Sequence, residues 1–127
     1  MPFILVVDDS EDMRTLLADV LAPAGYEVVT AGSAGRAIEV MAGRTPDLVI
    51  TDLFMPGMSG FALRGLMLRR SELADVPVIV LSAYWHRPSE TLDVAEVLTK
   101  PINLDRLLQV VERVLSSSGS VAEVEPR

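Results

Sequence analysis

The sequence has no cysteine, few aromatic residues and fewer basic than acidic side chains. The absence of cysteine excludes a disulfide framework, a thiolate metal site and a thiol nucleophile. Eleven lysines and arginines stand against 18 acids, and the net charge of −7 argues against direct binding to the phosphate backbone of nucleic acids. Such an excess of acids is compatible with carboxylates that gather around a metal ion.

A long hydrophobic run is also missing. The segment from Met1 to Val7 is apolar, but Asp8 follows it at once and no basic stretch precedes it, so it predicts neither a signal peptide nor a membrane span. A chain of 127 residues, 50% of them hydrophobic, can form one domain with a core but is short for two. We therefore expect a single domain in the cytoplasm, without membrane attachment.

The chain is organised around an apolar run that ends on an acid. The run from Leu48 to Asp52 has no apolar–polar alternation, which is typical of a strand covered on both faces of a parallel sheet. Pro56 and Gly57 then mark a turn. An acid at the carboxyl end of such a strand lies where open α/β sheets bind ligands, although an acid before a turn is often only a solvated turn residue. The other strand ends decide between these interpretations.

Strand-like and helical patterns alternate along the whole chain. Apolar runs predict strands over residues 3–7, 27–30, 48–52, 78–81 and 96–98. Apolar residues at helical spacing predict helices that begin after Ser10, Ser33, Gly60 and Asn103. The first of these helices has a stripe formed by Met13, Leu16, Leu17, Val20 and Leu21.

Two parts of the chain fit this alternation less well. Residues 83–95 show no clear pattern, and Pro88 is tolerated only in the first turn of a helix, so a fourth helix there would be short or irregular. Residues 116–127 are Ser-rich at first and have few apolar side chains, which predicts a flexible tail or linker after a domain of residues 1–115. The tail could end a stand-alone protein or lead to an output domain.

Successive βα units with short, right-handed connections predict an open, doubly wound, five-stranded parallel α/β sheet with helices on both faces. The carboxyl edge of this sheet would collect the polar residues that follow the strands. These residues are Asp8, Asp9, Asp52, Ser82 and Lys100.

This set of residues predicts a phosphoryl-transfer site. Three converging carboxylates repel one another unless a cation lies among them, so at least one folded-state pKa should be raised by like charge, partly offset by Lys100. Few protein oxygens with room for water favour Mg²⁺ over Ca²⁺. Lys100 and the hydroxyl of Ser82 suit phosphoryl oxygens. A carboxylate, a metal and two such groups form an aspartyl-phosphate site.

Over roughly residues 3–115 the sequence strongly resembles the receiver domain of bacterial two-component response regulators. The matching motifs are Asp8-Asp9, Asp52 with the following Met55-Pro56-Gly57-Met58-Ser59-Gly60, Ser82-Ala83 and Lys100-Pro101. The resemblance implies a flavodoxin-like fold with strand order 2-1-3-4-5 and a cis Lys100–Pro101 peptide.

The resemblance also implies a role for each site residue. Asp52 would be the phosphoacceptor, Asp9, Asp52 and the backbone carbonyl of Phe54 would bind Mg²⁺, and Asp8 would hold the ion through water. Ser82 and Lys100 would bind the phosphoryl oxygens. The phosphodonor would be a sensor histidine kinase or a phosphotransfer protein, and the modified domain would bind a partner differently. Such a protein is a switch rather than a metabolic enzyme.

The chain departs from the family pattern near the fifth strand. The family usually has an aromatic residue where this chain has Val97, and a Gly-Ala pair where it has Asp93-Val94. The segment between Ser82 and Lys100 is about one helical turn shorter than usual. Valine is stiff about χ1 and has no ring to reorient, so the usual relay is missing.

The signal must therefore travel differently. We expect Ser82 to close on the phosphoryl group and to reorder residues 83–88, so that Tyr84 and Trp85 change their exposure. His86, the only histidine, is expected to be a solvated loop residue.

Two alternative functions stay open. The first is a receiver-like binding module that signals without phosphorylation, which Val97 and the shortened segment would favour. The second is a phosphohydrolase that works through an aspartyl phosphate. It would need a general acid or base near Asp52, and the side chain of Phe54, two residues further on, is apolar.

Overall fold

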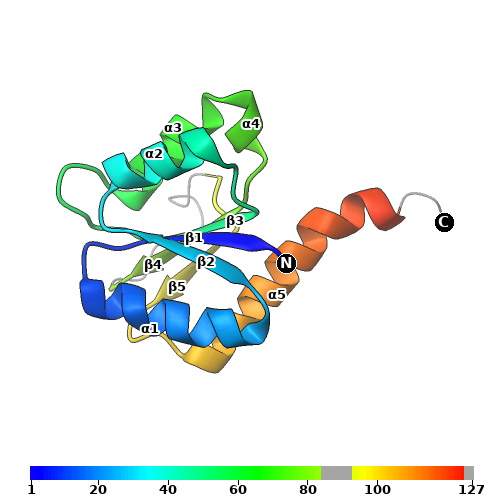
Figure 1. Cartoon of the computed structure of the whole chain (residues 1–127), viewed down its shortest axis with the longest axis horizontal. Helices are drawn as coiled ribbons and strands as arrows, with labels where there is room; N and C mark the ends of the chain where they lie inside the picture. Colours follow the sequence, from blue (N-terminus) through cyan, green and yellow to red (C-terminus); the bar gives the residue numbers. More distant parts are fainter. Residues whose placement is uncertain (84–92, 125–127) are drawn as a thin grey trace.

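The computed structural model describes residues 1–83 and 93–124, with side chains described as far as residue 116. A five-stranded parallel sheet lies between two layers of helices (Figure 1). In chain order the elements are β1 (Phe3–Val7), α1 (Glu11–Leu21), a short 3₁₀ helix η1 (Ala22–Ala24), β2 (Glu27–Ala31), α2 (Ala34–Gly43), β3 (Leu48–Asp52), α3 (Gly60–Leu68), α4 (Ser71–Ala74), β4 (Val78–Ser82), β5 (Glu96–Thr99) and α5 (Leu104–Val124).

The strand order is β2-β1-β3-β4-β5, and all four strand pairs are parallel. The predicted fold class and strand order are therefore confirmed. The chain crosses to one side of β1 for β2 and then to the other side for β3, so the crossover direction changes between β1 and β3. Ligands bind at this point in doubly wound sheets. The Lys100–Pro101 peptide is cis, as the resemblance implied.

Each strand is apolar throughout because both faces of the sheet are covered. Successive side chains point to opposite faces, so Leu5 and Val49 pack with α2 and α3, while Ile4 and Ile50 pack with α1 and α5. Figure 1 shows α1 and α5 on one side of the sheet and α2, α3 and α4 on the other. Two apolar cores thus hold the strand ends in fixed positions.

Side-chain caps fix where several helices begin. The hydroxyls of Ser10, Ser33 and Ser59 accept hydrogen bonds from the backbone N–H groups three residues further on. The carboxamide oxygen of Asn103 accepts a hydrogen bond from the N–H of Arg106 in the same way. The predicted caps at Ser10, Ser33 and Asn103 are confirmed.

The structure differs from the sequence analysis in three places. The side chain of Leu16 was placed on the buried stripe of α1, but 43% of Leu16 is exposed because Leu17 and Leu21 form the centre of the contact and Leu16 lies beyond its edge. Helix α4 was not predicted, because four residues are too few to show a helical period. Helix α5 continues to Val124, within the segment predicted to be a tail or linker, and the flexibility of that segment stays a prediction.

The extension of α5 has a simple cause. Once a helix is nucleated, each added residue gains a hydrogen bond, and serine is tolerated in a helix interior.

The division at residue 115 stays a prediction. The short or irregular fourth helix predicted within residues 83–95, and the predictions for Tyr84, Trp85, His86 and Pro88, fall on residues 84–92, outside the described residues. No helix in the described part of the chain is long and apolar enough to cross a membrane.

Adjacent leucines on α1 give a matched test of this packing. Leu17 is fully buried, and we expect Leu17→Ala to lower the free energy of unfolding by about 2–5 kcal/mol through lost apolar burial and a residual cavity. The control Leu16→Ala should cost less than about 1 kcal/mol, because much of that side chain already contacts water. Urea denaturation of both variants measures the difference, and equal losses would contradict this arrangement of α1.

Candidate functional site

Three acids converge at the carboxyl edge of the sheet. Asp8 and Asp9 directly follow β1, and Asp52 ends the neighbouring strand β3. Each of these residues offers one carboxylate oxygen, and the three oxygens lie within 4.8 Å of one another. The structure therefore brings together the acids that the sequence pattern grouped.

Asp8 is the buried member of this cluster, with 1% of its surface exposed. Its Oδ1 accepts a hydrogen bond from the backbone N–H of Ser10 at 2.9 Å, and Nη1 of Arg14 donates to its backbone carbonyl at 2.8 Å. Its Oδ2 is the one buried side-chain oxygen or nitrogen without a hydrogen-bond partner in the part of the chain that the structure describes. A buried, unpartnered carboxylate oxygen is costly unless a cation or water binds it.

The environment of Asp8 raises the pKa of its carboxyl group above the ordinary value. Burial is the main cause and the charges of Asp52 and Asp9 add to it, whereas the hydrogen bond from Ser10 and the charge of Lys100 lower this pKa. The predicted direction is confirmed, but desolvation exceeds like-charge repulsion as its cause. Because the folded-state pKa is raised, the stability provided by the protonated carboxyl is lost as pH rises through that pKa. At neutral pH, Asp8 therefore destabilises the fold.

Lys100 follows the edge strand β5 and reaches the cluster from that end of the sheet. Its Nζ donates to Oδ1 of Asp52 at 2.8 Å, with 27% of the Lys100 side chain and 12% of the Asp52 side chain exposed. The backbone N–H of Lys100 donates to the carbonyl of Ser82 at 2.6 Å, which fixes the end of β5 beside the end of β4. The ion pair is thus held by strand pairing and partly shielded from water.

Ser82 and Phe54 are both close to Asp52, the first on the neighbouring strand and the second two residues further along the chain. Ser82 is fully buried at the end of β4, one residue beyond Leu81, the residue that pairs with Asp52 in the sheet. Phe54 follows β3, and 58% of its surface is exposed. The role of its carbonyl as a metal ligand stays a prediction.

Gly60 joins α3 directly to the end of β3. The N–H of Gly60 donates to the carbonyl of Leu53 at 2.7 Å. A Cβ atom on Gly60 would lie 2.8 Å from the carbonyl oxygen of Asp52 and 3.1 Å from Cγ2 of Thr51. That oxygen also accepts a hydrogen bond from the hydroxyl of Thr51 at 3.0 Å. Only glycine fits here without a shift of the strand that carries Asp52.

Sequence reasoning missed the supporting residues Thr51, Arg14 and Arg64. Thr51 and Arg14 have common residue types at unremarkable positions, so the sequence carries no indication of their contacts. Arg64 could have been found, because it lies four residues after Gly60 and three before Met67, on the stripe that predicts burial. An arginine on such a stripe needs many buried acceptors.

Comparison with known proteins identifies the family. The chain matches the model of the response regulator receiver domain over residues 4–112. The chain belongs to this family. Receiver domains are signalling modules of two-component systems and generally bind Mg²⁺ at an acidic pocket, and this chain has the cluster of Asp8, Asp9 and Asp52.

Curated relatives of this receiver domain include longer proteins. The sensor histidine kinase TmoS of Ectopseudomonas mendocina is 37% identical over 122 residues, which cover 91% of this chain and 12% of the kinase. The phosphate regulon transcriptional regulatory protein PhoB of Pseudomonas aeruginosa is 33% identical over 120 residues, which cover 91% of this chain and 52% of PhoB. The receiver domain thus spans only part of these relatives.

Solved structures of response regulators have the same fold as this chain. The response regulator TrrA of Thermotoga maritima, in complex with Mg²⁺ and BeF, has a TM-score of 0.81 and 35% identity, covering 90% of this chain and 99% of TrrA. The chemotaxis response regulator CheY4 of Vibrio cholerae has a TM-score of 0.84 and 30% identity, covering 90% of this chain and 98% of CheY4.

Two glycines of α3 test the contact with Asp52. Gly60→Ala should lower the free energy of unfolding by about 1–3 kcal/mol, because the new methyl group clashes with the backbone of β3. In the control Gly65→Ala, the new Cβ atom meets nothing within 4 Å. That variant should gain about 0.5–1 kcal/mol from helix propensity. Thermal unfolding of both variants gives the comparison, and a neutral Gly60→Ala would show that α3 does not dock on Asp52.

Proposed function

We propose that this receiver domain accepts a phosphoryl group on Asp52 from a histidine kinase or a phosphotransfer protein, and that the modified domain binds a partner differently. The observation that carries the proposal is the ion pair of 2.8 Å between Lys100 and Asp52 at the edge of the three-acid cluster. A lysine beside Asp52 can bind a phosphoryl oxygen, and the neighbouring carboxylates can hold a metal ion that would neutralise the charge of the phosphoryl group.

The chemistry is a transfer between two nucleophiles. An oxygen of Asp52 forms a bond to phosphorus while the bond from phosphorus to the imidazole nitrogen of the donor breaks, and the electron pair of that bond leaves with the imidazole. Lys100 moves its charge from the carboxylate to a phosphoryl oxygen, and the hydroxyl of Ser82 binds a second one. A Mg²⁺ ion bound beside Asp52 supplies positive charge to the phosphoryl oxygens.

The acidic cluster fits Mg²⁺ in three respects. Its donors are carboxylate oxygens, which this hard cation prefers, and they are few enough to leave room for water. The unpartnered Oδ2 of Asp8 is buried beside the other acids and needs a positive or hydrogen-bonding partner. We assign Asp9, Asp52 and the carbonyl of Phe54 as ligands, with Asp8 acting through water.

A receiver that signals without phosphorylation is the second candidate, and the environment of Val97 favours it. Val97 pairs with Val80 in the sheet and packs against the core shared with α2 and α3. A valine held in this way offers no side chain that could swing between two positions.

The cytoplasmic location of the protein stays a prediction.

Measurement of the intact mass tests whether Asp52 is the nucleophile. After incubation with Mg²⁺ and acetyl phosphate, the unaltered domain should gain one phosphoryl group, and Asp52→Asn should gain none because an amide is a poor nucleophile. The exposed Asp19 on α1 offers a control, since Asp19→Asn keeps the site intact. Lys100→Ala and Ser82→Ala should slow transfer by about 10–100-fold without moving the modified residue. Full modification of the Asp52→Asn variant would refute the assignment, and an unmodified native domain would favour the second candidate.

The metal site is tested by thermal unfolding. Mg²⁺ at ten times its Kd should stabilise the domain by about 1.4 kcal/mol, since binding to the folded state alone adds RT ln(1 + [L]/Kd). KCl at the same ionic strength is the control for general charge screening. Asp9→Asn should remove most of the gain. A Tm that responds equally to KCl and to Mg²⁺ would count against a metal site.

A further inference from the structure

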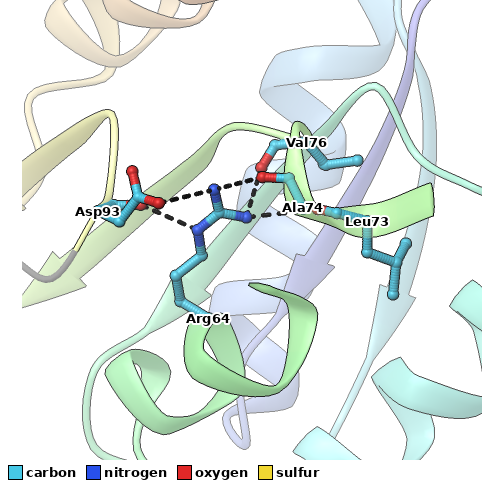
Figure 2. Close-up of polar contacts among 5 residues, drawn as sticks. All are labelled: Arg64, Leu73, Ala74, Val76 and Asp93. Atoms are coloured by element: carbon cyan, nitrogen blue, oxygen red, sulfur yellow. Dashed lines mark hydrogen bonds and ion pairs between the residues drawn. The ribbon is translucent and has the colours of Figure 1, made fainter. Parts of the chain in front are cut away.

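Arg64 is a buried cation outside the acidic site. It lies on α3, and 4% of its surface is exposed. Its guanidinium bridges two segments that are far apart in the sequence: the end of α4, and Asp93 just before β5 (Figure 2). Burial lowers the pKa of Arg64, while the charges of Asp93 and Asp75 oppose this shift. Arginine nevertheless stays protonated at neutral pH.

The guanidinium donates four hydrogen bonds to backbone carbonyls and forms one ion pair. Nε donates to the carbonyl of Asp93 at 2.9 Å. Nη1 donates to the carbonyls of Val76 at 2.8 Å and Leu73 at 3.4 Å, and Nη2 donates to that of Ala74 at 2.9 Å. Nη2 also lies 3.7 Å from Oδ2 of Asp93, which gives the cation its ion pair. A displacement of Arg64 therefore alters several contacts at once.

We call the contacts of Arg64 with the end of α4 and with Asp93 the clasp. Its two sides differ in strength. On the α4 side, loss of Arg64 would leave helix-end carbonyls without a donor, which is costly in a buried position. On the Asp93 side, 63% of the acid's side chain is exposed, so water can replace the lost contacts. The clasp can open at Asp93 while it stays closed at α4.

The backbone of Asp93 also favours opening. Its φ is 46°, and it is the one residue other than glycine with positive φ in the described part of the chain. This left-handed conformation is unfavourable for residues with a Cβ atom, though aspartate tolerates it better than most. Asp93 has this conformation while its carbonyl accepts the hydrogen bond from Arg64, so opening of the clasp would allow its backbone to relax.

Helix α3 connects the clasp to the phosphoacceptor. The N–H of its first residue, Gly60, donates to the carbonyl of Leu53, and a Cβ atom on Gly60 would lie 2.8 Å from the carbonyl oxygen of Asp52. Arg64 is one turn further along the same buried face. Since a short helix moves as a rigid unit, a shift of the Asp52 backbone at Gly60 displaces the guanidinium as well. Every residue on this path is described in the structure.

We propose that α3 transmits the state of Asp52 to the surface through Gly60 and Arg64, and that occupancy of the site releases Asp93 from the clasp. This inference rests on the proposed phosphoryl transfer to Asp52. It gives the domain a readout that needs no rotating aromatic residue at position 97. The released element is an exposed carboxylate just before β5, where a basic partner could bind it.

The direct test observes Arg64 itself. In ¹⁵N-detected spectra of the full chain, the Nε–H of Arg64 should exchange slowly with water while it is bonded to Asp93. Beryllofluoride with Mg²⁺, a mimic of the phosphoryl group, should speed this exchange severalfold. The carbonyl ¹³C signal of Asp93 should shift as well, whereas the backbone N–H signals of residues 74–76 should stay in place.

A matched pair of variants tests the reciprocal effect. Asp93→Ala and Asp93→Gly both lose the carboxylate, but only glycine accepts the positive φ without strain. Alanine therefore opens the clasp more readily, and linkage requires that it binds the mimic more tightly. We expect the Kd of the Ala variant to be roughly two- to fivefold below that of the Gly variant. Glu39→Ala, which breaks an exposed ion pair with Arg36 on α2, should leave the Kd unchanged.

The outcomes separate the two proposals. If the unaltered chain does not bind the mimic, the proposed function fails and the coupling fails with it. If the mimic binds while the Arg64 signal stays constant and the two Asp93 variants have equal Kd values, the coupling alone is overturned. A faster Arg64 exchange together with the expected order of Kd values supports both proposals.

Discussion

The ion pair between Lys100 and the cluster of three acids is the interaction on which the rest of the structure depends. Parallel pairing brings the carboxyl ends of β1, β3, β4 and β5 to one edge, so Asp8, Asp52 and Lys100 lie close together. Burial and like charge make this edge unfavourable for Asp8. The two apolar cores must offset that cost, and they hold the cluster in place. A destabilised acidic cluster has free energy to gain from binding a cation.

Helix α3 has two tasks that explain its unusual composition. At its start, glycine allows the helix to touch the carbonyl of Asp52, and one turn later an arginine replaces what would otherwise be an apolar core residue. The arginine is acceptable because the carbonyls of Leu73, Ala74, Val76 and Asp93 accept hydrogen bonds from its guanidinium. The short helix α4 thus matters to the site indirectly, because it provides the buried acceptors that keep Arg64 in place.

The strands and the site were predictable from the sequence because both follow from local patterns. Uninterrupted apolar runs predict buried strands, and the polar residue after each run then falls at the carboxyl edge whatever the details of packing. The exposure of Leu16, helix α4 and the extension of α5 were missed because they depend on the width of a helix contact, on a four-residue segment and on helix propagation. The contacts of Arg64 join residues up to 29 positions apart, and no local pattern records them.

A switch needs an element with two states of similar free energy, and the residues near β5 decide which element can serve. Val97 cannot, because it is stiff and packed between β4 and the helices. Asp93 can, because its left-handed backbone and its contacts with Arg64 act in opposite directions in the clasp. The strain favours release, and the contacts with Arg64 favour closure, so a small shift of α3 suffices to change the balance. With the coupling that we propose between Arg64 and Asp93, signalling would need no aromatic residue at position 97.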